Sequence, residues 1–213
     1  MKIYKRKFKF IKKNTLLDYL LNSFLSILII NWIFQGMRGM QLKELSFRVI
    51  AEILFIVLIF YFFRFSFLLS FLFVHTFFWI FLCQFWLINR YSLNYTNDLK
   101  KMNRIYKKII NKVLRFKTLE EAIVIGSLSS QKKISKINSD IDLRIFFNKS
   151  IKSYFSLNLF LCYLRMYSFL TKFPLDIYCY DNFEVFNKGI SKNDKILIIK
   201  DKNKNIKNFL IKR

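Results

Sequence analysis

A nearly continuous apolar run over residues 47–88 restricts the fold of this chain more than any other feature of its sequence. The run is broken mainly by Arg48, Glu52, Arg64 and His75. A helix needs about 20 apolar residues to cross the hydrocarbon core of a bilayer. The run therefore has room for two crossings, or for one crossing and a re-entrant piece. Because a charge is costly inside lipid, we expect Arg64 to mark the turn of a helical hairpin or to snorkel to an interface.

The segments before this run indicate how it is oriented. Residues 1–13 are strongly basic, and residues 16–34 are apolar but interrupted by polar side chains, without the small-residue cleavage site of a secretory signal. Lys and Arg are abundant on both sides of the apolar part, which favours an even number of crossings with both flanks in the cytoplasm. We therefore expect a membrane-associated helical region over residues 1–92, with a hairpin within 47–90 and an interfacial helix over 16–34. The alternative is a hydrophobic helical bundle that lies on a membrane or on a partner.

The charge balance points to anionic partners. The chain has 37 Lys and Arg against 13 Asp and Glu, a formal net charge of +24. Such a charge favours nucleic acid, phospholipid surfaces or nucleotides, although a solvated basic surface is the plain alternative. The three cysteines, Cys83, Cys162 and Cys179, lack metal-binding spacing and are expected to be small core residues. The single His75 is expected to be packed in the apolar region rather than to be a ligand.

The second half of the chain alternates between helical and strand patterns. Residues 97–116 form an amphipathic pattern that Thr96 or Asn97 could cap, and its basic side could face anionic headgroups or water. Further patterns predict strands over 121–125, 140–147, 175–180 and 195–200, and a helix over 150–172. We therefore expect a small α+β domain with a mixed sheet over residues 93–213.

Two aspartates, one residue apart, bring chemistry to the second of these strands. Because side chains alternate along a strand, Asp140, Asp142 and Arg144 share one face. Like charges this close repel unless a cation lies between them, and Mg²⁺ prefers such carboxylate oxygens together with substrate phosphates. Asp176 lies on a later strand and can supply a third carboxylate if the two strands are neighbours. A magnesium site is therefore predicted on this face.

A Gly-Ser pair follows the first strand directly. Glycine permits close approach of the backbone, so the N–H groups at Gly126 and the Ser127 hydroxyl can cradle a phosphate. The following polar stretch contains Ser129, Ser130, Lys132 and Lys133, which also suit phosphate oxygens. Together with the aspartates, this stretch suits a phosphoryl or nucleotidyl transfer with two metal ions.

The ordered set of Gly126, Ser127, Asp140, Asp142 and Asp176 resembles the nucleotidyltransferase superfamily of DNA polymerase beta type, over about residues 119–182. The resemblance implies that Asp140 and Asp142 hold both metal ions and that Asp176 holds the metal that activates an acceptor hydroxyl. It also implies that the Gly126 backbone and Ser127 hold the triphosphate. Arg144 could steady a phosphate or form a salt bridge with the aspartates.

These expectations combine into a hypothesis of function. The chain would be a membrane-anchored, Mg²⁺-dependent nucleotidyltransferase on the cytoplasmic side of the membrane, with a nucleoside triphosphate, membrane lipids and an unknown acceptor as its partners. The acceptor could be a lipid-linked sugar, a glycan precursor or a phospholipid headgroup. The alternatives are an antitoxin-like regulator that acts through a partner protein and a non-catalytic nucleotide sensor. The sequence argues against a nucleic-acid polymerase, because no aromatic-interleaved binding surface is evident.

Overall fold

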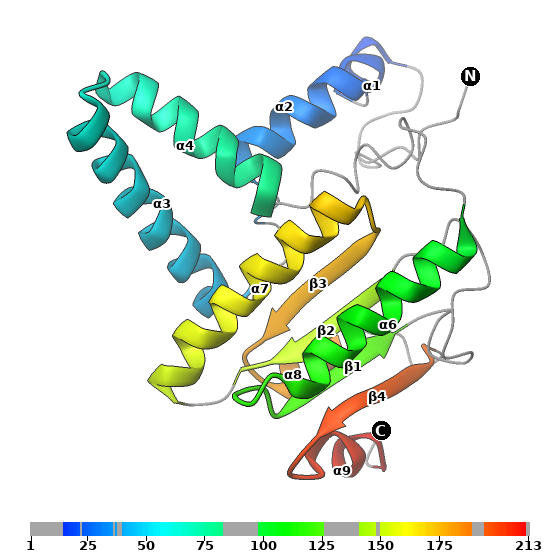
Figure 1. Cartoon of the computed structure of the whole chain (residues 1–213). Coiled ribbons are helices and arrows are strands. Elements are labelled where there is room, and N and C mark those ends of the chain that lie inside the picture. Colours follow the sequence, from blue (N-terminus) through cyan, green and yellow to red (C-terminus); the bar gives the residue numbers. More distant parts are fainter. Residues whose placement is uncertain are drawn as a thin grey trace.

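The computed structural model describes residues 15–21, 23–35, 37, 40–82, 98–125, 141–147, 150–188 and 194–211. These residues form an α+β arrangement in which helices accompany one mixed sheet (Figure 1). The helices in the first part of the chain are α1 (Leu16–Leu21), α2 (Phe24–Phe34), α3 (Leu42–Phe63) and α4 (Phe67–Leu82). The second part contains α6 (Leu99–Arg115), β1 (Glu121–Ile125), β2 (Ile141–Phe146), α7 (Ile151–Thr171), β3 (Leu175–Tyr180), α8 (Phe183–Lys188), β4 (Ile196–Asp201) and α9 (Asn205–Ile211).

The sheet has four strands in the order β3-β2-β1-β4. β1 pairs antiparallel with both β2 and β4, whereas β2 and β3 are parallel. The helix α7 makes the crossover between the two parallel strands, as such a connection requires. The predicted mixed sheet is therefore confirmed, and the predicted strand over residues 195–200 is present one residue later as β4.

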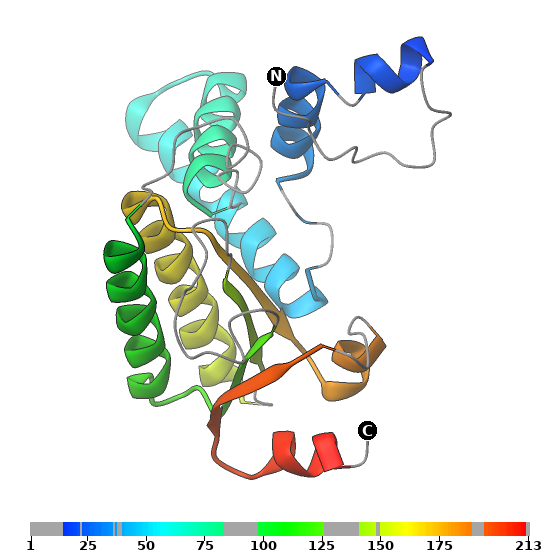
Figure 2. The ribbon, with the colours of Figure 1, turned by 90° about the vertical axis from the view of Figure 1, so that its right-hand side faces the viewer.

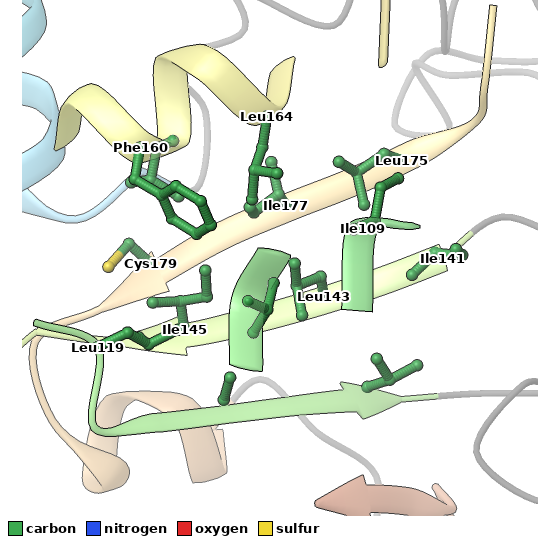
Figure 3. Close-up of a cluster of buried hydrophobic side chains, with 14 of the residues drawn as sticks. Ile109, Leu119, Ile141, Leu143, Ile145, Phe160, Leu164, Leu175, Ile177 and Cys179 are labelled. Carbon is green, nitrogen blue, oxygen red and sulfur yellow. The ribbon is translucent and has the colours of Figure 1, made fainter. Parts of the chain in front are cut away.

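One face of the sheet is covered by α6 and α7 (Figures 1 and 2). Leu143 and Ile177 point from the sheet toward Phe160 and Leu164 of α7, and Ile109 of α6 joins the same cluster (Figure 3). Asp98 begins α6, because its carboxylate accepts hydrogen bonds from the backbone N–H groups of Lys100 and Lys101. Removal of these side chains from water holds the two helices on the sheet.

The opposite face of the sheet is divided into an apolar and a polar part. Ile123, Ile125, Phe146, Phe186 and Ile206 form a buried cluster that joins β1 and the end of β2 to α8 and α9. Figure 2 places α8 and α9 on the side of the sheet that faces away from α6 and α7. The sequence patterns did not predict α8 and α9. The polar part of this face, on β2 and β3, carries the candidate site.

The first part of the chain projects away from the sheet as a helical hairpin of α3 and α4 (Figure 1). α3 ends at Arg64, which takes a left-handed backbone conformation as the C-cap, and α4 begins at Phe67. The expectation that Arg64 marks the turn of a hairpin is therefore confirmed. Among the described helices, α3 is the one long and apolar enough to cross a membrane. This is a weak indication of membrane insertion, because the core helix of a soluble protein can be as long and as apolar.

A row of buried polar side chains, which we call the polar seam, lies inside the hairpin. Glu44, Arg48 and Glu52 recur at every fourth position of α3 and are buried. The Nδ1 atom of His75 lies 2.7 Å from the Glu52 Oε1 atom, and its Nε2–H donates to the Trp32 carbonyl oxygen at 2.9 Å. His75 is thus packed inside the helical region, as expected. The seam joins α2, α3 and α4 by hydrogen bonds that an apolar surrounding strengthens.

Several boundaries differ from the sequence prediction. The apolar stretch over 16–34 forms two helices, because the Ser23 side chain accepts from the Ser26 N–H and starts α2 anew. The hairpin begins at Leu42 rather than at residue 47, because α3 extends back to Gln41, which takes an extended backbone conformation at the N-cap position. Asp98, rather than Thr96 or Asn97, caps α6. Cys179 is buried and Cys162 is half-buried, whereas Cys83 and the basic residues 1–13 lie outside the described residues.

Candidate functional site

The candidate site lies on the polar part of the sheet face opposite α6 and α7. Asp142 on β2 and Asp176 on β3 are directly opposite each other as register partners of the parallel pair. The next pair on the same face is Arg144 and Tyr178. Their neighbours in sequence, Ile141, Leu143, Ile145, Leu175, Ile177 and Cys179, point the other way into the core. The alternation of a strand therefore gathers four polar side chains on one patch of the sheet.

Arg144 joins the two carboxylates. Its Nη2 atom lies 3.5 Å from the Oδ1 atom of Asp142 and 3.3 Å from the Oδ2 atom of Asp176. Its Nη1–H group donates to the backbone carbonyl oxygens of Leu143 and Asp176, each at 3.2 Å. The Arg144 side chain is 13% exposed, against 32% for Asp142 and 18% for Asp176. The two carboxylates and the guanidinium thus form an ion-paired group that is partly screened from water.

Tyr178 forms the wall beside this ion pair. The guanidinium carbon of Arg144 lies 4.9 Å from the centroid of the Tyr178 ring, which is a cation–π contact. Burial, with a smaller contribution from the Asp176 carboxylate, raises the pKa of the Tyr178 hydroxyl above its usual value. Tyr178 therefore keeps its proton at neutral pH and can serve as a hydrogen-bond donor there.

The ends of the strands show where the predicted phosphate loop connects. β1 ends at Ile125, whose register partner on β2 is Asp142. The segment 126–140 leaves β1 after Ile125 and enters β2 at Ile141, so both of its connections are at the Asp142 end of the sheet. Gly126, Ser127, Ser129, Lys132 and Asp140 belong to this segment and lie outside the described residues. The structure therefore brings together Asp142, Asp176 and Arg144, the three predicted site residues that it describes.

The suitability of this patch for a metal ion rests on its donor set. Within the described residues, His, Cys, Asp and Glu side chains form no group of three that could hold a metal ion. Asp142 and Asp176 supply two carboxylates, and Arg144 already places a cation within 3.5 Å of both. One or two carboxylates with substrate phosphates are a usual environment for Mg²⁺. Asp142 and Asp176 thus fit the ion that the sequence predicts and would be two of its ligands.

A buried ion pair ties the site strand to the hairpin. Arg165 of α7 donates from Nη2 to the Ile177 carbonyl oxygen at 3.1 Å and also to the Glu44 carboxylate of α3. Ile177 follows Asp176 directly on β3. The exposed side chain of Lys43 adds a contact 3.8 Å from Asp181, just after the same strand. The sequence analysis missed this connection, although a charged residue within the apolar pattern of α7 was the signal for it.

Comparison of the chain with protein-family models found no matching family, and comparisons with curated proteins and with solved structures found no match.

Proposed function

We propose that the chain is a membrane-anchored nucleotidyltransferase that moves a nucleoside monophosphate from a nucleoside triphosphate to a hydroxyl acceptor. The observation that carries the proposal is the direct opposition of Asp142 and Asp176 on parallel strands, on the sheet face that α6 and α7 leave uncovered. The mixed parallel and antiparallel sheet, and the position of Gly126 directly after β1, also support the resemblance to nucleotidyltransferases of DNA polymerase beta type.

The proposed reaction assigns a role to each group at the site. The acceptor oxygen bonds to the α-phosphorus as the bond from that phosphorus to the bridging oxygen of pyrophosphate breaks, and pyrophosphate leaves. Asp140, Asp142 and Asp176 would hold Mg²⁺, and Asp176 would also take the proton of the acceptor hydroxyl. When bound, Mg²⁺ neutralises phosphate charge and lowers the pKa of the acceptor hydroxyl. The protein residues contribute chiefly by positioning and by electrostatic stabilisation.

The exposed surface of the hairpin supports a membrane anchor. The side chains around its turn are large, apolar and exposed, among them Phe60, Phe62, Phe63, Phe65 and Phe67. Only 17% of the most apolar window of α3 is buried, whereas a core helix of a soluble protein would be mostly buried. Large exposed apolar patches mark interaction sites. Beside a net charge of +24, this patch favours insertion into an anionic membrane from its cytoplasmic side.

The proposed function is tested by label transfer. The full-length protein in nanodiscs would be given Mg²⁺, each α-labelled nucleoside triphosphate in turn and a lipid and glycan extract from its source. We expect label to move to an acceptor in a reaction that Asp142→Asn abolishes and that Glu184→Gln, a change at an exposed carboxylate of α8, leaves intact. Transfer that survives Asp142→Asn would contradict the proposed site.

A second candidate, a non-catalytic nucleotide sensor or partner-binding regulator, is favoured by one observation. The Arg144 guanidinium lies within 3.5 Å of a carboxylate oxygen of both Asp142 and Asp176, so it already compensates part of their negative charge. A sensor of this kind would bind a nucleoside triphosphate in the same assay, with binding lost in Asp142→Asn, and transfer no label. That result would replace the enzyme by the regulator.

A further inference from the structure

The helix α7 carries large apolar side chains on two opposite sides. Its inner side places Leu157, Leu161 and Leu164 in the core, each fully buried. Its opposite side carries a second row of large apolar side chains between 37% and 78% exposed, which we call the outer stripe: Ile151, Phe155, Leu159, Tyr163, Met166 and Leu170. Their spacing of three or four residues keeps them in line along the helix. A contiguous row of large exposed apolar side chains marks a surface that contacts a partner or a membrane.

The side of the outer stripe that borders α6 is basic. The Lys112 ammonium lies 4.5 Å from the centroid of the Tyr163 ring and 5.1 Å from that of Tyr167. Lys108 and Arg115 of α6 are also exposed, as are Lys152 and Lys172 at the two ends of α7. Neither α6 nor α7 contains an Asp or a Glu. Lysines along an apolar strip can keep their stems on it and extend their charges to anionic headgroups.

The other side of the outer stripe is continuous with the hairpin. The rings of Phe47 on α3 and Phe155 on α7 are 6.2 Å apart, and those of Phe81 on α4 and Phe169 on α7 are 4.8 Å apart. Figure 1 shows α7 between the hairpin and α6, with its length crossing the base of the hairpin. The outer stripe therefore extends the exposed apolar surface of the hairpin across α7, toward the basic side of α6.

We propose that the outer stripe rests on the surface of an anionic bilayer, with the lysines of α6 against the lipid headgroups. The charge of α6 and the continuity with the hairpin select lipid as the occupant. This inference rests on the membrane-anchoring half of the proposed function and is independent of the transferase chemistry. It places Asp142 and Asp176 on the sheet face directed away from the bilayer. An acceptor hydroxyl would then be held away from the lipid surface, as on a lipid-linked glycan and unlike a phospholipid headgroup.

The test uses the full-length protein with its three cysteines replaced by alanine and one cysteine introduced at Leu159. An environment-sensitive fluorophore on that cysteine would be quenched in turn by spin-labelled acyl chains and by iodide. The protein would be in nanodiscs of phosphatidylcholine and phosphatidylglycerol. Asn208 on the exposed surface of α9 gives the matched aqueous control, and Leu58 on α3 reports the hairpin. Met166→Cys repeats the measurement in case the label at Leu159 disturbs packing.

We expect the acyl-chain quencher to act several-fold more strongly at Leu159 than at Asn208, and iodide to show the reverse order. Removal of the anionic lipid should weaken the lipid quenching at Leu159. Iodide access at Leu159 equal to that at Asn208 would overturn the inference. Protection from both quenchers would also overturn it, because a protein segment or a second copy would then cover the outer stripe. Lipid quenching at Leu58 without lipid quenching at Leu159 would overturn the inference about the outer stripe but support the membrane anchor. Iodide access at both Leu58 and Leu159 would contradict the membrane anchor as well.

Discussion

Asp142 and Asp176 face each other across the parallel strands β2 and β3, and the guanidinium group of Arg144 lies within 3.5 Å of a carboxylate oxygen of each. Two carboxylates on neighbouring strands repel each other when both are charged. A cation is therefore needed beside them, and the protein supplies one from its own chain. The proposed function requires that a metal ion share or take over this role.

Replacement of either carboxylate should weaken metal binding. Asp142→Asn and Asp176→Asn each delete one charge from a set that the donor chemistry assigns to Mg²⁺. We expect Mn²⁺ binding without nucleotide, measured by electron paramagnetic resonance, to weaken in both variants and label transfer to fall by about a hundredfold or more. Glu184→Gln is the control for an equal loss of charge at an exposed position of α8. Undiminished Mn²⁺ binding in both aspartate variants would exclude this site.

Removal of Arg144 should have the opposite effect on the metal. Arg144→Gln takes away the positive charge that competes for Asp142 and Asp176, so Mn²⁺ affinity without nucleotide should rise by about tenfold, or ~1.4 kcal/mol. Arg115→Gln removes the same charge from an exposed position of α6 and should leave the affinity unchanged. Calorimetric titration of the two variants measures the difference. Equal or weaker binding in Arg144→Gln would mean that Arg144 supports the metal site instead of competing for it.

The pairing of Glu121 with Asp201 should make stability depend on pH. The two acidic residues are register partners on β1 and β4. Burial first, and the neighbouring Asp201 and Glu120 charges in addition, raise the pKa of Glu121 in the folded protein. The stability associated with its protonated form is therefore present below the unfolded pKa and is lost as the pH rises through the raised folded value.

Glu121→Gln should remove that loss of stability. Glutamine keeps an oxygen that can accept from the Asn205 amide, the present partner of Glu121, and it no longer repels Asp201. We expect the variant to be more stable than the parent by about 0.5 kcal/mol at pH 8, with the difference shrinking toward pH 4. Asp201 is unsuitable for the same change, because its carboxylate accepts from the Ile206 and Lys207 N–H groups at the start of α9. Melting curves that differ equally at both pH values would refute the role of ionisation.

Loss of Glu44 should loosen the hairpin from the sheet. Its carboxylate lies against Arg165, and both side chains are almost fully buried, at 1% and 2% exposed. Glu44→Ala would leave a buried guanidinium without its carboxylate, which costs about 3–5 kcal/mol. We expect a lower melting temperature in detergent and faster proteolysis between the hairpin and the sheet. Glu184→Ala, at an exposed position, should change neither measurement. A normal melting temperature in Glu44→Ala would show that solvent replaces the lost carboxylate beside Arg165.

Local periodicity allowed most of the secondary structure to be predicted. The short apolar run over 121–125 and the alternation along 175–180 predicted the bounds of β1 and β3. The N-cap at Ser150 places the start of α7 within one residue of the prediction. The same alternation put Asp142 and Arg144 on one face of β2. These features depend on backbone geometry within a few residues, so the local sequence is enough to predict them.

The tertiary structure decided which distant groups meet. The sequence permitted Arg144 either a phosphate or the aspartates as its partner, and the parallel pairing of β2 with β3 brought Asp176 to it. Apolar residues also lie on two opposite sides of α7, and only the packing of α6, the sheet and the hairpin left the outer stripe exposed. Strand order, register and the burial of Glu44 against Arg165 depend on contacts between segments far apart in the chain. Such contacts leave no periodic signal in the sequence, because each is fixed by the combined packing of all the elements.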